Sequence, residues 1–151
     1  MTEHRATIRW VSDGDFKSNR YSRLHDWSFD GGAVVKASSS PQVVAMPMSD
    51  PTAVDPEEAL VASVSSCHML WFLSIARDEG FEVASYDDEA VGTMGRDRSG
   101  RISVTRITLY PEVSFVGEAP NPKEMQWLHH KAHEHCFIAN SLRTEVVVGT
   151  R

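Results

Sequence analysis

The first third of the chain alternates between apolar and polar side chains, a pattern typical of strands. Residues 7–11 predict one strand, and residues 21–29 predict a second, with Tyr, Arg, His, Trp and Phe on one face. Residues 30–32 (Asp-Gly-Gly) predict a tight turn, because glycine accepts a positive φ without a Cβ clash. Residues 33–37 should therefore return as the second arm of a hairpin, and the Ser-, Pro- and Asp-rich residues 38–54 predict a loop.

A long apolar stretch then predicts a helix over residues 55–79. Asp55 can cap its start, and Gly80 is a natural stop. Its middle, residues 59–76, has almost no polar side chains apart from serines and His68. A helix that is apolar all round must be covered on every side, which one small sheet cannot do. We therefore expect a central helix buried between a sheet and another helix, for which a second subunit is one source.

The following segment returns to strand patterning. Residues 83–93 and 102–115 predict paired strands around a turn at residues 96–100. The apolar positions at the start and the end of the second run are out of phase with each other. One extra residue near Thr105 or Arg106 would reconcile them, so we expect a β-bulge there.

Residues 121–124 (Asn-Pro-Lys-Glu) carry the cap, proline and acidic residue of a helix start. This helix should run to about Cys136, and residues 145–148 should close the chain as a strand. The predicted order is hairpin, long helix, hairpin, helix, strand. We expect an α+β fold, in a single domain spanning residues 1–151.

Composition narrows the class of protein. The 151 residues have a net charge of −6, which is not the footprint of a nucleic-acid-binding protein. The longest apolar run, residues 69–75, is too short to span a bilayer, and the N-terminus lacks the apolar core of a signal peptide. We expect a cytoplasmic protein without a membrane partner. Two cysteines exclude a disulfide-rich scaffold.

Cys67 and Cys136 are the candidate reactive groups, although each could also be a small buried hydrophobe, half of a disulfide or a metal ligand. The thiolate is the nucleophilic form, and an apolar mid-helix site disfavours it. A reactive Cys67 therefore needs a nearby cation, for which arginine is best suited, and a partly buried arginine needs a carboxylate. Glu57 lies ten residues before Cys67, about 15 Å along a helix axis. Either a long arginine spans part of this gap, or an antiparallel neighbouring helix supplies its own Glu57.

Two segments together resemble a known family. Residues 55–67 (Asp-Pro-Glu-Glu-Ala-Leu-Val-Ala-Ser-Val-Ser-Ser-Cys) are similar to the central-helix motif of the OsmC/Ohr family, the osmotically inducible protein C and organic hydroperoxide resistance proteins. Residues 132–136 (Ala-His-Glu-His-Cys), followed by Asn140 and Ser141, resemble its second-cysteine segment. The predicted order of elements matches this family over nearly the whole chain.

The resemblance implies an OsmC-like fold in which a long buried central helix packs on antiparallel sheets in an intertwined homodimer. It implies a thiol-dependent peroxidase that reduces organic hydroperoxides to alcohols, with hydrogen peroxide as a further candidate substrate. Cys67 aligns with the peroxidatic cysteine, which becomes a sulfenic acid, and Cys136 aligns with the resolving cysteine, which forms the disulfide. Glu57 aligns with the carboxylate that orients an arginine. No cofactor or metal is implied; an external dithiol, such as a lipoyl protein, would restore the thiols.

The identity of the arginine is open. Members of the family carry it either after the first strand or shortly before the Pro-Glu motif, and residues 42–54 contain no arginine. Arg20 and Arg23 are the candidates. Arg23 is favoured slightly, because it would share a strand face with Tyr21 and Trp27.

Two other classes of function compete with a peroxidase. His129 and His133 are four residues apart, a spacing that can chelate a divalent metal on one helix face, and His135 and Cys136 could add ligands. The apolar residues 69–72 could instead line the pocket of a non-enzymatic, dimeric ligand-binding protein. His68, directly after Cys67, could be a core histidine or act near the thiolate.

Overall fold

The alternating N-terminal residues form a three-stranded antiparallel sheet in the computed structural model, which describes residues 2–151. Strands β1 (Ala6–Arg9), β2 (His25–Phe29) and β3 (Val34–Ala37) lie in the order β1-β2-β3. The predicted hairpin is confirmed, with Gly32 in its turn at φ +94°. Residues up to Ala59 form one compact unit and residues from Leu60 a second one, and each is described separately.

The strand predicted over residues 21–29 is too long at its N-terminal end. Residues 21–24 form an irregular segment before β2. The ring of Tyr21 packs against those of Trp10 and Phe16, with centroids 5.5 and 4.8 Å away, and the backbone N–H of Ser22 donates to Asp13. These loop contacts replace the strand pairing that the alternation predicted.

The long apolar stretch forms helix α1 (Pro56–Asp78), as predicted. The Asp55 side chain accepts the N–H of Glu58, and the Glu58 side chain accepts the N–H of Asp55, which together make a capping box. Gly80, at φ +87°, ends the helix. By length and composition alone α1 could cross a membrane, but one of its faces packs into the core of the second unit. Its buried residues are spaced by four, at Val64, His68, Phe72 and Ala76.

The next segment forms four strands: β4 (Glu82–Asp88), β5 (Val91–Arg96), β6 (Ile102–Leu109) and β7 (Pro111–Val116). The prediction of a single strand over residues 83–93 is wrong, because β4 pairs with β7 and β5 pairs with β6 in separate sheets.

The break between the two sheets coincides with contacts that Asp88 makes to distant parts of the chain. The Asp88 carboxylate accepts the N–H of Tyr110 at 2.7 Å and the hydroxyl of Ser65 at 2.5 Å. Pro111 follows Tyr110 and has no N–H for a ladder. The predicted bulge is confirmed: Thr93 pairs with Arg106 and Met94 with Val104, which leaves Thr105 as the extra residue.

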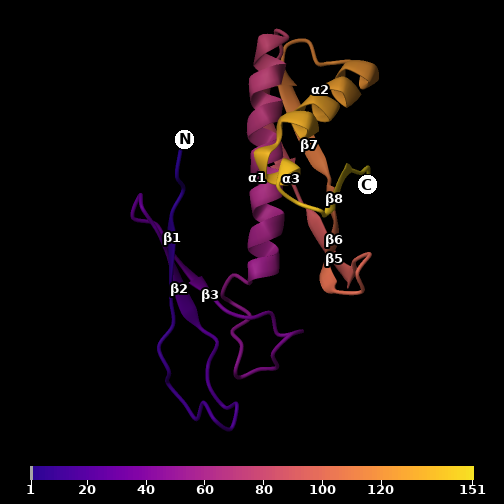
Figure 1. Ribbon diagram of the computed structural model, residues 1–151. Helices are drawn as coiled ribbons and strands as arrows, with labels where there is room; N and C mark the ends of the chain where they lie inside the picture. The colour runs from indigo at the N-terminus through magenta and orange to yellow at the C-terminus, as the bar shows by residue number, and fades with distance from the viewer. Residues whose placement is uncertain (1) are drawn as a thin grey trace. The chain divides into compact units, whose positions relative to one another are not determined.

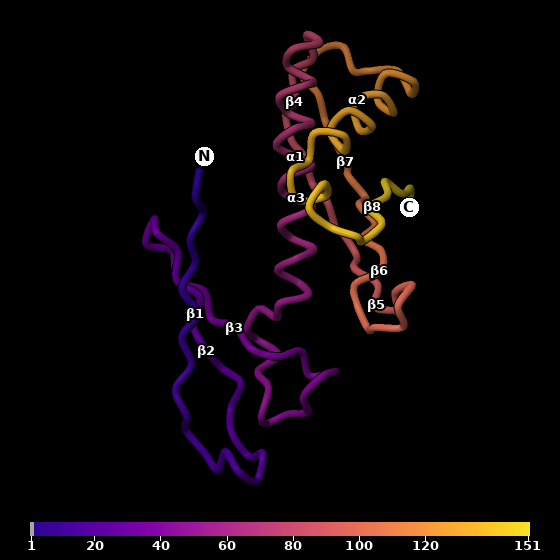
Figure 2. Tube along the Cα trace, in the orientation of Figure 1, coloured from indigo at the N-terminus to yellow at the C-terminus, as the bar shows by residue number. Residues whose placement is uncertain are grey.

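The chain closes with helix α2 (Pro122–His135), a short helix α3 (Phe137–Asn140) that the sequence did not predict, and strand β8 (Glu145–Val148). Strand β8 runs parallel to β6, so this one pairing departs from the expected antiparallel sheets. In Figures 1 and 2 the C-terminal end of α2 and the short α3 approach the middle of α1. Two apolar clusters hold these elements: Phe72, Ala76, Leu128 and Ala132 between α1 and α2, and Val64, Ile107 and Leu109 between α1 and β6.

The start of α2 provides a test of local stability. The Asn121 side chain accepts the N–H of Glu124, and the Glu124 side chain accepts the N–H of Asn121. We expect Asn121→Ala to lower the free energy of unfolding by about 1 kcal/mol, because an N–H at the helix start loses its acceptor. Asn121→Asp should cost much less, since its carboxylate is also a good cap. Urea denaturation at one fixed protein concentration measures both variants, and equal losses would contradict this assignment.

Candidate active site

The two cysteines of the chain lie together where α2 ends against α1. Cys67 is half-buried on α1, Cys136 is buried between α2 and α3, and both are free thiols. The Cys136 sulfur lies 4.0 Å from the carbonyl oxygen of Val64, one helical turn before Cys67. The N–H of Ala139 donates to the same sulfur at 3.4 Å, so Cys136 also caps α3. This cap fixes the position of the Cys136 side chain.

The surroundings of Cys136 favour its protonated form. Burial raises the pKa of the Cys136 thiol to about 11, and the neighbouring Cys67 thiol acts in the same direction as a hydrogen-bonding partner. The N–H of Ala139 opposes this shift. At neutral pH Cys136 is therefore a thiol, whose S–H donates to the carbonyl oxygen of Val64.

A buried pair of histidines lies beside the thiols. His68 Nε2 and His129 Nδ1 share a hydrogen bond of 3.0 Å, and the two rings stack with centroids 5.3 Å apart. The ring of His129 also stacks on Phe72 at 4.5 Å. His68 Nδ1 is buried without a hydrogen-bonding partner among the described residues.

Both histidines are held neutral. Burial lowers the pKa of each from 6.5 to about 4, because an imidazolium ion loses its hydration there. For His68, charges on His129 and His133 lower the pKa further; for His129, the carboxylate of Asp88 partly offsets the effect of burial. In the competing metal-binding interpretation His129 would chelate together with His133, but His129 faces His68 instead.

The other side chains of the competing metal-binding interpretation are also placed elsewhere. His135 stacks on Trp71 with ring centroids 5.0 Å apart, and Cys136 is engaged by Val64 and Ala139. Over residues 2–151, no group of three or more His, Cys, Asp or Glu side chains is arranged to hold a metal ion.

Glu57, Arg20 and Arg23 belong to the N-terminal unit. Arg23 donates to the carbonyl of Tyr21 at 2.7 Å and to the side chain of Asn19 at 2.6 Å, and its guanidinium lies 3.6 Å from the centre of the Tyr21 ring. Arg23 lies before β2 rather than within a strand, so the shared strand face expected for it does not exist. The side chain of Arg20 is 74% exposed and lies 3.7 Å from Asp15. Across residues 2–151, Glu57 makes no ion pair with an arginine.

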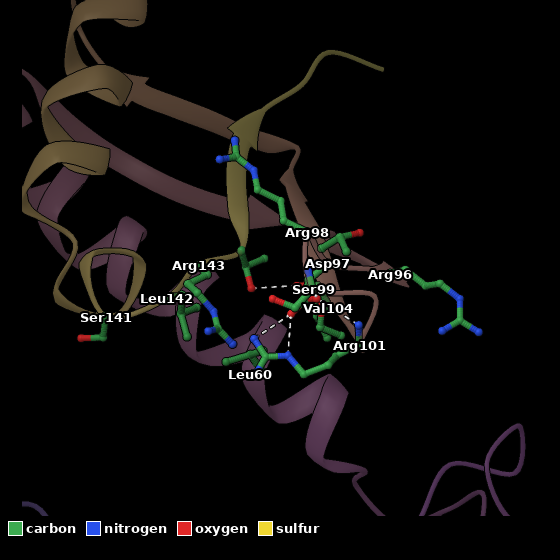
Figure 3. Close-up of a pocket in the computed structure, with 13 residues that line it drawn as sticks. Leu60, Arg96, Asp97, Arg98, Ser99, Arg101, Val104, Ser141, Leu142 and Arg143 are labelled. Atoms are coloured by element: carbon green, nitrogen blue, oxygen red, sulfur yellow. Dashed lines mark hydrogen bonds and ion pairs between the residues drawn. The ribbon is translucent and has the colours of Figure 1, made fainter.

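The second unit also has an open cavity of about 840 Å³, close to the N-terminal part of α1 (Figure 3). Leu60, Val104 and Leu142 give it an apolar wall. Arg101 is paired with Asp97, and Arg143 points towards the same carboxylate, while Arg96 and Arg98 point away. The hydrogen bond from the backbone of Arg101 is the largest of several that lower the pKa of Asp97. Neither cysteine lines this cavity.

Comparison with known proteins identifies the family. Residues 49–151 match the model of the OsmC-like proteins. This chain belongs to the OsmC-like family. No curated protein matches it.

Solved structures share the fold along the whole chain. An OsmC-like protein of unknown function from Vibrio cholerae is 49% identical, with 100% of each chain covered and a TM-score of 0.96. The organic hydroperoxide resistance protein OhrB of Bacillus subtilis is 18% identical over 99% of this chain and 98% of its own, with a TM-score of 0.71. An organic hydroperoxide resistance protein from Elizabethkingia anophelis, solved with thiocyanate bound, is 15% identical over 99% of both chains, with a TM-score of 0.68. The expected α+β OsmC-like fold, with its central helix, is thus confirmed.

The sequence of this OsmC-like protein gave incomplete signals for its histidines. His68 stands out as the one imidazole in an apolar helix, but its partner could not be named from spacing alone. The role of Asp88 in joining α1 to the two sheets was missed, because nothing in its local sequence indicates that it accepts hydrogen bonds from Ser65 and Tyr110.

The neutral histidines make stability depend on pH. Between pH 6.5 and about 4 the unfolded chain binds protons that the folded chain does not, so stability falls as pH falls through this window. We expect a loss of roughly 3 kcal/mol or more in the free energy of unfolding. Denaturant titration across the window measures it. His68→Gln should reduce the dependence, because only His129 then contributes, and His130→Ala, on an exposed side chain, should leave it unchanged. A wild-type profile that is flat from pH 6.5 to 4 would refute buried neutral rings.

Proposed function

We propose that this OsmC-like protein is a thiol-dependent peroxidase that reduces organic hydroperoxides to alcohols. The observation that supports this most directly is the pair of free thiols, with Cys136 held against the helix that carries Cys67. The shared fold with organic hydroperoxide resistance proteins is consistent with the proposal. The activity of the Vibrio cholerae relative is not known, so the chemistry must be argued from the residues.

In the first step the Cys67 thiolate attacks the distal oxygen of the hydroperoxide. The sulfur–oxygen bond forms as the oxygen–oxygen bond breaks, and the alkoxide leaves and takes up a proton to become the alcohol. Cys67 is then a sulfenic acid. The half-buried position of Cys67 is compatible with access for a small peroxide.

In the second step Cys136 attacks the sulfur of the sulfenic acid. The disulfide forms, and hydroxide leaves with the thiol proton of Cys136 as water. The raised pKa of Cys136 suits this order, because a protonated Cys136 does not compete for the peroxide before Cys67 is oxidised. An external dithiol, for which a lipoyl protein is one candidate, then restores both thiols by exchange.

Arg23 is the proposed cation for the thiolate and the departing alkoxide, with Glu57 as the carboxylate that orients it. The contacts of Arg23 with Tyr21 and Asn19 hold its guanidinium in one position, as a preorganised cation requires. Arg20 is more exposed and is the weaker candidate.

A cytoplasmic homodimer is part of the same proposal, in which residues 1–151 act as one OsmC-like domain. Helix α1 leaves apolar side chains exposed outside its packed face, Leu70 to 60%. Glu57 has no arginine partner within its own described chain, and a neighbouring subunit could supply one. The open cavity beside Leu60 favours the alternative of ligand binding without catalysis, but it contains neither thiol.

The two cysteines can be tested separately. Cys67→Ser should abolish turnover of cumene hydroperoxide, because the nucleophile is lost. Cys136→Ser should still allow one oxidation per chain but no disulfide, since Cys67 then has no partner in the fold. Intact-mass analysis after one equivalent of hydroperoxide distinguishes a gained oxygen from the loss of two hydrogens.

Two results would reject the peroxidase. One is turnover retained in Cys67→Ser. The other is a wild-type protein whose thiols stay unchanged after hydroperoxide, which would favour ligand binding instead.

The arginine assignment has a matched control within one short segment. Arg23→Ala should lower kcat/KM for hydroperoxide by roughly 100-fold or more, the usual cost of removing one preorganised group that stabilises charge in the transition state. Arg20→Ala should stay close to the wild type, because its partner Asp15 lies at the surface. Steady-state kinetics with a synthetic dithiol measures both variants, and the reverse ranking would assign the role to Arg20.

A further inference from the structure

The buried histidines form the one hydrogen bond that joins α1 to α2 among the described residues. The other contacts between these helices are ring stacking, of His135 on Trp71 and of His129 on Phe72, and an apolar cluster. The cluster consists of Phe72, Ala76, Leu128 and Ala132. Apolar contacts have no preferred direction, so they are compatible with more than one register of α2 along α1. A buried hydrogen bond has a preferred distance and angle, so it selects one register.

The place of the pair along the two helices connects it to the thiols. His68 directly follows Cys67, and His129 precedes Cys136 by seven residues, about two helical turns and therefore on nearly the same face. The helices run in opposite directions, since Cys136 lies against Val64 while Leu128 packs with Phe72 and Ala76. A shift of α2 by one turn would break the histidine bond and carry Cys136 about 5 Å along α1.

We propose that His68 and His129 are positioning residues whose shared hydrogen bond holds α2 in the register that sets Cys136 against Cys67. The thiol pairing itself is a property of the fold, and its use as a reaction step rests on the proposed function. In that step the bond that forms is between the two sulfurs, and the thiol proton leaves with the hydroxide of the sulfenic acid as water. Neither histidine touches the reacting atoms.

The bond requires one N–H and one lone pair, so it suits two neutral rings. When His68 is the donor, its buried Nδ1 carries only a lone pair. When both rings are protonated, two N–H groups face each other and the bond is lost. The charged or titratable groups around the pair are His133 on α2, Asp88 and Tyr86 on β4, and Cys67 on α1.

Amide side chains allow a test that keeps or removes the bond. The terminal amide of glutamine reaches the position of Nε2, and the amide of asparagine reaches that of Nδ1. His68→Gln and His129→Asn therefore keep a polar atom at the bonding position, whereas His68→Asn and His129→Gln displace it. His68→Leu and His129→Leu remove it, and His130→Ala alters an exposed side chain of α2 as the control.

Two measurements use the full-length protein. One is the equilibrium constant for forming the Cys67–Cys136 disulfide in a glutathione redox buffer, which reports how well the two thiols are placed and needs no peroxide. The other is the first-order rate of disulfide formation after one equivalent of cumene hydroperoxide, followed by quenched mass analysis.

The displaced and leucine variants should lower both quantities roughly tenfold, as expected when a buried hydrogen-bonding group loses its partner. His68→Gln, His129→Asn and His130→Ala should stay within about threefold of the wild type. The second-order rate at which hydroperoxide oxidises Cys67 should be unchanged in all of them, which a general loss of structure would not allow.

The proposal is overturned if the leucine variants fold and keep the wild-type equilibrium constant, or if Gln and Asn at position 68 behave alike. If the leucine variants do not fold, the test is the difference in the disulfide equilibrium constant between His68→Gln and His68→Asn. The proposed function fails separately: a wild type that is inert to hydroperoxide, but whose disulfide equilibrium responds as described, leaves the positioning role intact and removes the peroxidase.

Discussion

The packing of the C-terminal end of α2 on the middle of α1 is the interaction on which the rest of the second unit depends. It places Cys136 within reach of the helix that carries Cys67, and it buries His68 and His129 against each other. The same contact completes the apolar cluster around Phe72. Because Cys136 directly follows the last residue of α2, its distance from Cys67 depends on how α2 packs on α1.

This arrangement combines two kinds of stabilisation with different roles. Apolar burial supplies most of the free energy that holds α2 in place, but it does not specify register. The hydrogen bond between two neutral imidazoles adds little net stability and a strong preference for one geometry. Burying polar rings is costly unless they are paired, and His68 is only half satisfied, because its Nδ1 has no hydrogen-bonding partner within residues 2–151. The core therefore contains a polar pair, His68 and His129. The pair lies where the alignment of α1 with α2 determines the distance between the two cysteines.

Much of the fold was predictable because its determinants are local. The caps Asp55 and Asn121, the stop at Gly80 and the bulge at Thr105 follow from residues close in sequence, and the structure confirms them. The split into separate sheets was not predictable, because it depends on Asp88 reaching Ser65 and Tyr110, more than twenty residues away. A local pattern indicates propensity and phase, but not which distant N–H or hydroxyl groups will donate to a partly buried carboxylate.

The same distinction applies to the site. Cys67 and Cys136 could be chosen from the sequence because the two motifs that contain them resemble those of one family. The histidines could not be assigned, because a spacing of four between His129 and His133 describes only their own helix and not what packs on it. The structure gives His129 a partner 61 residues away and so removes it from any chelate with His133. The spacing of residues in the sequence thus identifies which side chains share one face of a helix. The partners of those side chains depend on the element that packs against that face.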